Sequence, residues 1–132
     1  MKRINTLCIV DDDSTFQFLT RTVIEESQLV ERIKIFSNGK AAIDFLTSTH
    51  DQPEELPEII LLDLNMPILD GWGFLEEYLL PKPRIGKKIL ICIVSSSIDP
   101  EDVEKARTIS EVTDCVLKPV TQEKFINLIK TL

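Results

Sequence analysis

Five short apolar runs, separated by polar turns and by segments with helical periodicity, constrain the fold of this 132-residue chain most strongly. Continuous aliphatic runs of this length predict strands that are buried on both faces, as in a parallel sheet. The length suits one domain with a single core. We therefore expect one domain over residues 1–132, with strands near residues 7–10, 33–36, 59–62, 89–94 and 115–117.

Helices are expected after each strand, which predicts a doubly wound, flavodoxin-like α/β fold with five helices and strand order 2-1-3-4-5. Ser14 is a candidate N-cap for the first helix, whose expected core side includes Phe16 and Leu19. The segment Thr47–Glu58 is polar and acidic, and Pro81–Lys88 is rich in proline and basic residues. Both segments are predicted to be surface loops.

Composition excludes several classes of protein. The formal net charge of −7 argues against direct nucleic-acid binding, which depends on cationic contacts to phosphate. The longest apolar run, Ile89–Val94, is too short to span a membrane. The aspartates at 11–13 interrupt the N-terminal apolar segment, so no signal peptide is expected, and we predict a cytoplasmic protein without a membrane partner.

Polar side chains follow four of the predicted strands at the point where each strand ends. In a parallel sheet these carboxyl ends meet at one edge, where ligands bind in open α/β folds. The edge would receive three carboxylates, a hydroxyl and an ammonium group. They belong to Asp11, Asp12, Asp63, Ser95 and Lys118.

Three carboxylates at one edge would repel one another unless a cation lay among them. Oxygen ligands of this kind favour Mg²⁺, with Mn²⁺ as an alternative. A carboxylate can itself attack phosphorus and form an aspartyl phosphate. The metal and Lys118 would offset the charge on the transferring oxygens, and Ser95 could hydrogen-bond one of them. These groups together fit phosphoryl transfer onto an aspartate.

The motifs at this edge resemble those of response-regulator receiver domains, of the single-domain type related to the chemotaxis regulator. The resemblance covers essentially the whole chain. It rests on Val10-Asp11-Asp12, on Asp63 through Gly71 (DLNMPILDG), on Val94-Ser95-Ser96 and on Lys118-Pro119.

The resemblance implies that Asp63 accepts a phosphoryl group from a histidine kinase or a histidine-phosphotransfer protein. Asp12, Asp63 and the backbone carbonyl of Asn65 would bind Mg²⁺ directly, and Asp11 would hold it through water. Lys118 would pair with the phosphoryl oxygens, and the Lys118–Pro119 peptide bond would be cis. Ser95 would move toward the phosphoryl group, while Asn65 and Ser97 would tune dephosphorylation.

Two features depart from the usual pattern of this family. Cys115 stands where the family has a switch aromatic, so switching would have to rely on other contacts. The interval from Ser95 to Lys118 is about one residue longer than is common, which leaves Ser95 and Ser96 as alternatives for the switch hydroxyl. The segments 47–58 and 81–88 would be insertions.

The expected activity is that of a phosphoacceptor switch, not of an enzyme in the ordinary sense. With no output domain expected, a separate protein would read the switch, and the chain would be a monomer or weak dimer. Two alternatives remain open. Asp11 and Asp13 also fit the nucleophile and the acid/base of a small haloacid-dehalogenase-type phosphatase. The chain could also be an adaptor that keeps the receiver fold without using phosphorylation.

Overall fold

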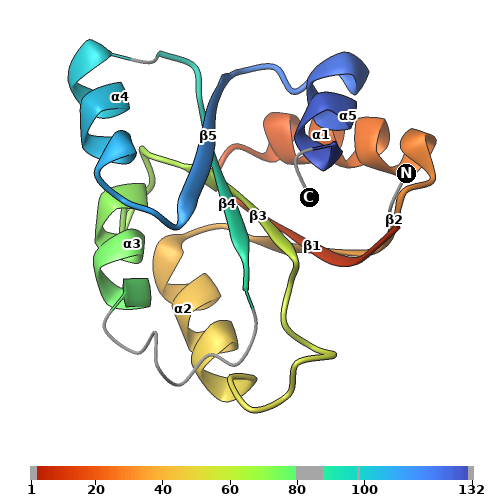
Figure 1. Cartoon of the computed structure of the whole chain (residues 1–132), viewed down its shortest axis with the longest axis horizontal. Helices are drawn as coiled ribbons and strands as arrows, with labels where there is room; N and C mark the ends of the chain where they lie inside the picture. The colour runs from red at the N-terminus through yellow and green to blue at the C-terminus, as the bar shows by residue number, and fades with distance from the viewer. Residues whose placement is uncertain (1–2, 80–87, 98, 131–132) are drawn as a thin grey trace.

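The chain folds into a three-layer α/β sandwich (Figure 1), described here from a computed structural model over residues 3–79, 88–97 and 99–130. Five parallel strands form one sheet in the order β2-β1-β3-β4-β5, as predicted. The strands are β1 (Ile4–Val10), β2 (Val30–Phe36), β3 (Ile59–Asp63), β4 (Leu90–Ser95) and β5 (Val112–Leu117). Within the described residues, the helices are α1 (Ser14–Ser27), α2 (Gly39–Ser48), α3 (Gly71–Leu79), α4 (Pro100–Arg107) and α5 (Gln122–Ile129).

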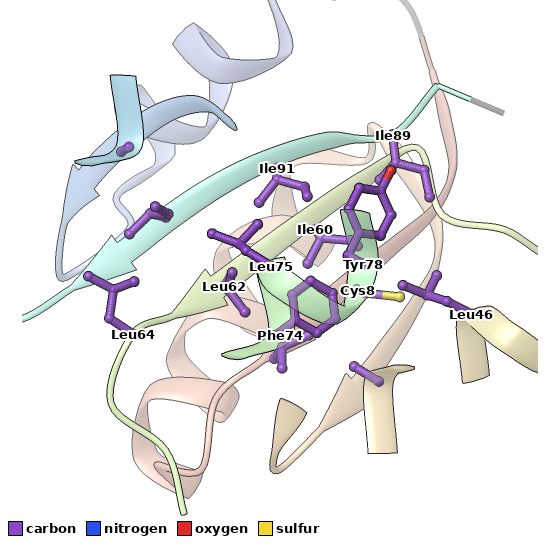
Figure 2. Close-up of a cluster of buried hydrophobic side chains, with 14 of the residues drawn as sticks. Cys8, Leu46, Ile60, Leu62, Leu64, Phe74, Leu75, Tyr78, Ile89 and Ile91 are labelled. Atoms are coloured by element: carbon purple, nitrogen blue, oxygen red, sulfur yellow. The ribbon is translucent and has the colours of Figure 1, made fainter. Parts of the chain in front are cut away.

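Helices cover both faces of the sheet and enclose two apolar layers. Helices α1 and α5 lie on one face, and α2, α3 and α4 lie on the other (Figure 1). Phe74 and Tyr78 of α3 stack in the second layer with ring centroids 6.1 Å apart, against Leu62 and its neighbours on the central strands (Figure 2). Burial on both faces explains why the central strands are continuous apolar runs.

Three strands are longer than the sequence indicated. Strands β1, β2 and β5 begin at Ile4, Val30 and Val112, three residues before the predicted starts near 7, 33 and 115. Their added residues include exposed polar side chains such as Arg32 and Asp114. Strands β2 and β5 form the edges of the sheet, where solvent admits polar residues that interrupt an apolar run. In the central strand β1, the exposed Asn5 and the buried Thr6 interrupt the apolar pattern in the same way. Searching for continuous apolar runs therefore misses strand residues that lie beyond a polar side chain.

Helix α1 begins one residue earlier than predicted, and its exposed side differs. Asp13, not Ser14, is the N-cap, and its carboxylate accepts hydrogen bonds from Thr15 N at 2.9 Å and Phe16 N at 3.3 Å. Leu19 is 52% exposed, so its placement on the core side was wrong. Phe16 is buried while Phe18 is 68% exposed, because residues two apart on a helix point about 200° apart.

Two predicted loops have different outcomes. Helix α2 continues to Ser48, and the loop after it buries Leu56 and Pro57, so the segment 47–58 is only partly a solvated loop. Most of the segment 81–88 lies outside the described residues.

Helix α4 is weakly anchored, as its thin apolar face predicted, since Ala106 is its one buried residue. None of the helices in the described ranges is both long and apolar enough to cross a lipid bilayer.

The two aspartate caps offer a test of the local structure. We expect Asp13→Ala to lower the free energy of unfolding by about 1 kcal/mol, because two amide groups of the first turn lose their acceptor. Asp99 begins α4 but makes no hydrogen bond through its side chain, so Asp99→Ala should cost clearly less. Urea denaturation of both variants measures the difference. Equal losses would show that Asp13 stabilises the helix only through its negative charge at the N-terminus and not through its two hydrogen bonds.

Candidate phosphoryl-transfer site

Three carboxylates meet at the carboxyl edge of the sheet, where strands β1 and β3 end. Asp11 and Asp12 follow β1 directly, and Asp63 is the last residue of β3. One carboxylate oxygen from each lies within 4.8 Å of the other two. Asp11 and Asp63 are buried, whereas Asp12 is exposed and leaves the cluster open to solvent. The structure thus brings together the three acids that the sequence indicated.

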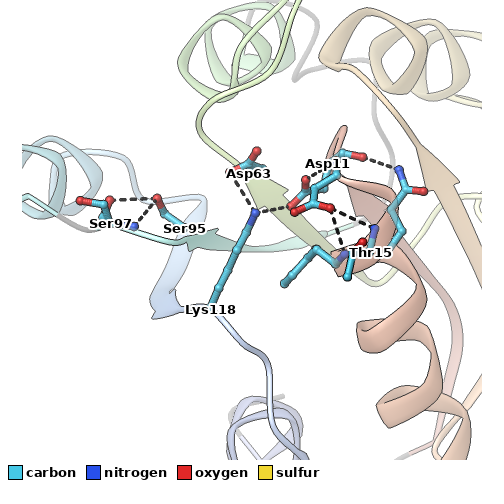
Figure 3. Close-up of polar contacts among 9 residues, drawn as sticks. Asp11, Thr15, Asp63, Ser95, Ser97 and Lys118 are labelled. Carbon is cyan, nitrogen blue, oxygen red and sulfur yellow. Dashed lines mark hydrogen bonds and ion pairs between the residues drawn. The ribbon is translucent and has the colours of Figure 1, made fainter.

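Lys118 reaches this cluster from the end of β5 (Figure 3). Its Nζ lies 2.8 Å from Asp11 Oδ2 and 3.6 Å from Asp63 Oδ1. The Lys118 amide donates to Ser95 O at 2.8 Å, which joins the ends of β5 and β4, and the Lys118–Pro119 peptide bond is cis. The ammonium group therefore lies between a buried acid and the acid at the end of β3.

The electrostatic environment of Asp63 disfavours its charged form. Burial and the negative charges of Asp11 and Asp12 raise the pKa of Asp63 from 3.8 to about 6. Lys118 and a hydrogen bond from the backbone of Asn65 act in the opposite direction and leave the pKa below that of a fully unpaired buried acid. One ammonium group is thus insufficient to neutralise this cluster, and a further cation would be stabilised there.

The hydroxyl group at the end of β4 is engaged with its own loop. Ser95 is buried, and its Oγ donates to Ser97 O at 2.9 Å and accepts from Ser97 N at 3.3 Å (Figure 3). Ser96 and Ser97 are exposed beyond the strand. Of the two candidate hydroxyls, Ser95 is therefore the one that the strand fixes beside β3.

The loop between Asp63 and α3 is held close to the end of β3. The Gly71 amide donates to Leu64 O at 3.0 Å, and a Cβ at position 71 would lie 2.5 Å from Asp63 O. Only glycine permits this approach of backbone to backbone. Asp70 Oδ1 accepts from Gly73 N at 2.8 Å at the start of α3. The sequence marked these residues as a turn but did not indicate that Gly71 packs against the backbone of Asp63.

Two side chains of α1 also contact the site, and the sequence did not indicate either. Gln17 Nε2 donates to Asp11 O at 2.5 Å, which ties the backbone of that acid to α1. The Phe16 ring lies under the Lys118 ammonium group, with Nζ 4.3 Å from the ring centroid. Helical periodicity placed Phe16 in the core, and only the folded structure shows its second contact, with Lys118 at the end of β5.

Cys115 lies away from the acids, on the α4 side of β5. It is half-buried and lines an open groove of about 290 Å³ between α4 and β5, together with Val103, Ala106, Arg107 and Val112. Burial is the first cause that raises the pKa of the Cys115 thiol, followed by the nearby charge of Asp114. The Cys115 side chain at this groove is therefore a small, neutral thiol.

Fold and site together define a doubly wound α/β protein with an acidic, lysine-bearing site at the carboxyl edge of its sheet. Residues 7–130 match the family model of the response regulator receiver domain. The chain therefore belongs to the response regulator receiver family of two-component systems.

Similar proteins differ in how much of their own length this chain spans. A two-component response regulator from Cytophaga hutchinsonii superposes with a TM-score of 0.90 at 32% identity, over 98% of this chain and 97% of that one. The probable methanogenesis regulatory protein FilR2 of Methanothrix harundinacea is 26% identical over 89% of this chain and 74% of its own length. A protein-glutamate methylesterase/protein-glutamine glutaminase of Rhodospirillum rubrum is 27% identical, but this chain spans only 28% of it. The shared part is thus the receiver domain.

Proposed function

We propose that this chain is a phosphorylation switch that accepts a phosphoryl group on Asp63. The observation that carries the proposal is the position of the Lys118 ammonium group, 2.8 Å from Asp11 and 3.6 Å from Asp63 in the cluster of three carboxylates. A buried nucleophile next to a fixed positive charge is what transfer of an anionic phosphoryl group requires.

The acids fit a hard divalent cation, with Mg²⁺ as the proposed ion and Mn²⁺ as an alternative. Asp12, Asp63 and the backbone carbonyl of Asn65 would hold it, with Asp11 contributing through water. The fit rests on the oxygen donor set and on the mutual repulsion that raises the pKa of Asp63. When bound, such an ion neutralises charge on the phosphoryl oxygens.

The chemistry needs one ionised oxygen of Asp63. That oxygen attacks phosphorus, the phosphorus–nitrogen bond of a phosphohistidine donor breaks, and the electron pair leaves with the imidazole nitrogen. The Lys118 ammonium group, already within reach of Asp63, offsets charge on the transferred group. Slow attack of water on phosphorus would later restore the carboxylate, with Asn65 and Ser97 controlling access to it.

Phosphorylation would be transmitted through the end of β4. Ser95 would exchange its hydrogen bonds with Ser97 for one to the phosphoryl group, and the loop to the weakly anchored α4 would follow. Because Cys115 is small, this movement would not depend on an aromatic side chain. Phosphorylation would in this way shift an existing equilibrium between two conformations of the surface. A separate output protein would bind the surface formed by α4, β5 and α5. Both the phosphoryl transfer and this binding would take place in the cytoplasm.

Labelling with a small phosphodonor tests the assignment of Asp63. With acetyl phosphate and Mg²⁺, the wild-type chain should acquire one acid-stable, hydroxylamine-labile phosphate, and Asp63→Asn should acquire none. Asp44→Asn, which alters an exposed acid on α2, is the control and should label normally. Labelling that persists in Asp63→Asn would overturn the assignment.

Two alternatives are tested by other assays. A haloacid-dehalogenase-type phosphatase would hydrolyse phosphomonoesters with multiple turnovers and lose activity in Asp11→Asn. The receiver family and the use of Asp13 as a helix cap weigh against it. A phosphorylation-independent adaptor would bind its partner equally well with and without beryllofluoride.

A further inference from the structure

The amine of Lys118 rests on an aromatic ring as well as on carboxylates. Its Nζ lies 4.3 Å from the centroid of the Phe16 ring, which is 7% exposed. Phe16 lies in the first turn of α1, where its amide donates to the Asp13 cap at 3.3 Å. Its ring belongs to the apolar layer formed with Val120 and Phe125, which flank the start of α5. The position of the ring is therefore fixed from two sides.

The surroundings of this ammonium group make the ring contact strong. The Lys118 side chain is only 16% exposed, so water solvates little of its charge. A cation–π contact gains strength when the cation is desolvated, so the contact at Lys118 should be stronger than one at an exposed site. An aliphatic side chain at position 16 would fill similar space but would offer no partial negative charge to the ammonium group.

A ring face also differs from a hydrogen-bond acceptor in its directionality. The ammonium group has three N–H bonds that donate to acceptors in fixed directions. The attraction to a ring depends mainly on the distance to its face, so the three N–H bonds stay free to turn from Asp11 toward a group on Asp63. The contact thus fixes the position of Nζ without fixing the orientation of its N–H bonds.

We propose that Phe16 is a positioning residue, which seats the Lys118 ammonium group beside Asp63 and allows its N–H bonds to turn from the Asp11 carboxylate, its ion-pair partner, toward the incoming phosphoryl group. The inference rests on the proposed phosphoacceptor function. It assigns to α1 a part in the transfer step in addition to its packing role.

The chain supplies a matched control for this contact. Lys34 Nζ lies 5.3 Å from the centroid of the Phe45 ring on α2, in the apolar layer on the opposite face of the sheet. Phe45→Leu therefore removes a phenyl ring that carries a cation–π contact, but away from Lys118. Comparing Phe16→Leu with Phe45→Leu separates the loss of a ring from the loss of this particular ring.

Phosphorylation rates with acetyl phosphate at saturating Mg²⁺ test the proposal. We expect Phe16→Leu to slow phosphorylation roughly tenfold, from the energy of a desolvated cation–π contact. Mg²⁺ affinity should change less than about twofold, because no proposed metal ligand is altered. Phe16→Tyr, which retains the ring face, should restore most of the rate, and Phe45→Leu should react at the wild-type rate.

A second measurement does not depend on activity or on a truncated side chain. In the metal-free wild-type protein, the ε-methylene protons of Lys118 should show an upfield ring-current shift by NMR, which Phe16→Leu should abolish. Placing 3,4,5-trifluorophenylalanine at position 16 keeps the shape of the ring but weakens its attraction for a cation, and it should slow phosphorylation as Phe16→Leu does.

The outcomes separate this inference from the function on which it rests. If the wild-type chain takes up no phosphate, the phosphoacceptor function fails. If it does so and Phe16→Leu or the trifluoro variant reacts at the wild-type rate, only the role of Phe16 is overturned. A rate in Phe45→Leu as low as that in Phe16→Leu, or a parallel loss of Mg²⁺ affinity, would also overturn it.

Discussion

Replacing Lys118 with methionine is expected to reduce phosphorylation of Asp63 at least about 100-fold, the scale seen when one preorganised electrostatic contact to a transition state is lost. Methionine retains an unbranched apolar stem but carries no charge. The positive charge that lies 3.6 Å from Asp63, which we propose to offset phosphoryl charge, would therefore be absent. The rate of phosphate incorporation from acetyl phosphate measures the effect.

The same substitution should also destabilise the metal-free protein. Asp11 is 1% exposed and has its ion pair to Lys118 at 2.8 Å, so the variant would leave a buried carboxylate without its counter-charge. Loss of one partner from a buried pair costs on the order of 3–5 kcal/mol. Urea denaturation in EDTA measures this loss, and added Mg²⁺ should recover part of it.

A lysine on the surface provides the control. Lys40 pairs with Asp44 at 3.1 Å, and both side chains are about two-thirds exposed. Lys40→Met should change the free energy of unfolding by less than about 0.5 kcal/mol and leave phosphorylation intact. If Lys118→Met behaved like Lys40→Met in both assays, the ammonium group would have no special part in the site.

The sequence predicted which charged side chains meet at this edge because the strand ends alone determine it. Asp11, Asp63 and Lys118 each follow an apolar run directly, and parallel strands bring their carboxyl ends together. The apolar parts of the strands were found for a related reason, since burial on both faces favours continuous aliphatic runs. The polar residues near the starts of β1, β2 and β5 and the exposed Leu19 depend on which face each element presents to its neighbours.

Contacts across layers were beyond prediction from the sequence. Phe16 lies over a hundred residues before Lys118, and its helical spacing indicates burial but not the partner of its ring. Gly71 likewise appeared as a turn residue, although its close approach to the Asp63 backbone is what requires glycine. Both depend on the packing of one element against another, which a periodic pattern does not specify.

In the metal-free protein, Asp63→Asn is expected to raise stability at pH 7.5. The pKa of Asp63 is raised from 3.8 to about 6, so the folded state binds its proton more tightly than the unfolded state does. The protonated carboxyl group of Asp63 stabilises the folded state at low pH. This stabilisation is lost as the pH rises through about 6, and above that pH the ionised carboxylate opposes folding. A shift of this size corresponds to about 3 kcal/mol.

Asparagine has nearly the shape of aspartate but does not ionise, so the variant should escape this loss. We expect its melting temperature in EDTA to exceed that of the wild type by several degrees at pH 7.5, with the difference shrinking toward pH 4. Wild-type protein melted at the same low pH is the internal control, because protonation then removes the same charge.

Mg²⁺ should reverse the order of the two proteins. A cation bound by the acids stabilises the folded state by mass action, and Asp63→Asn removes one charged ligand from the site. The wild type should therefore gain more in melting temperature from Mg²⁺ than the variant does. If Asp63→Asn were less stable than the wild type in EDTA at pH 7.5, the ion pair with Lys118 would outweigh burial and carboxylate repulsion. A site of that kind would be neutralised by its own lysine and would have little need of a metal, so this comparison bears directly on why three acids are gathered here.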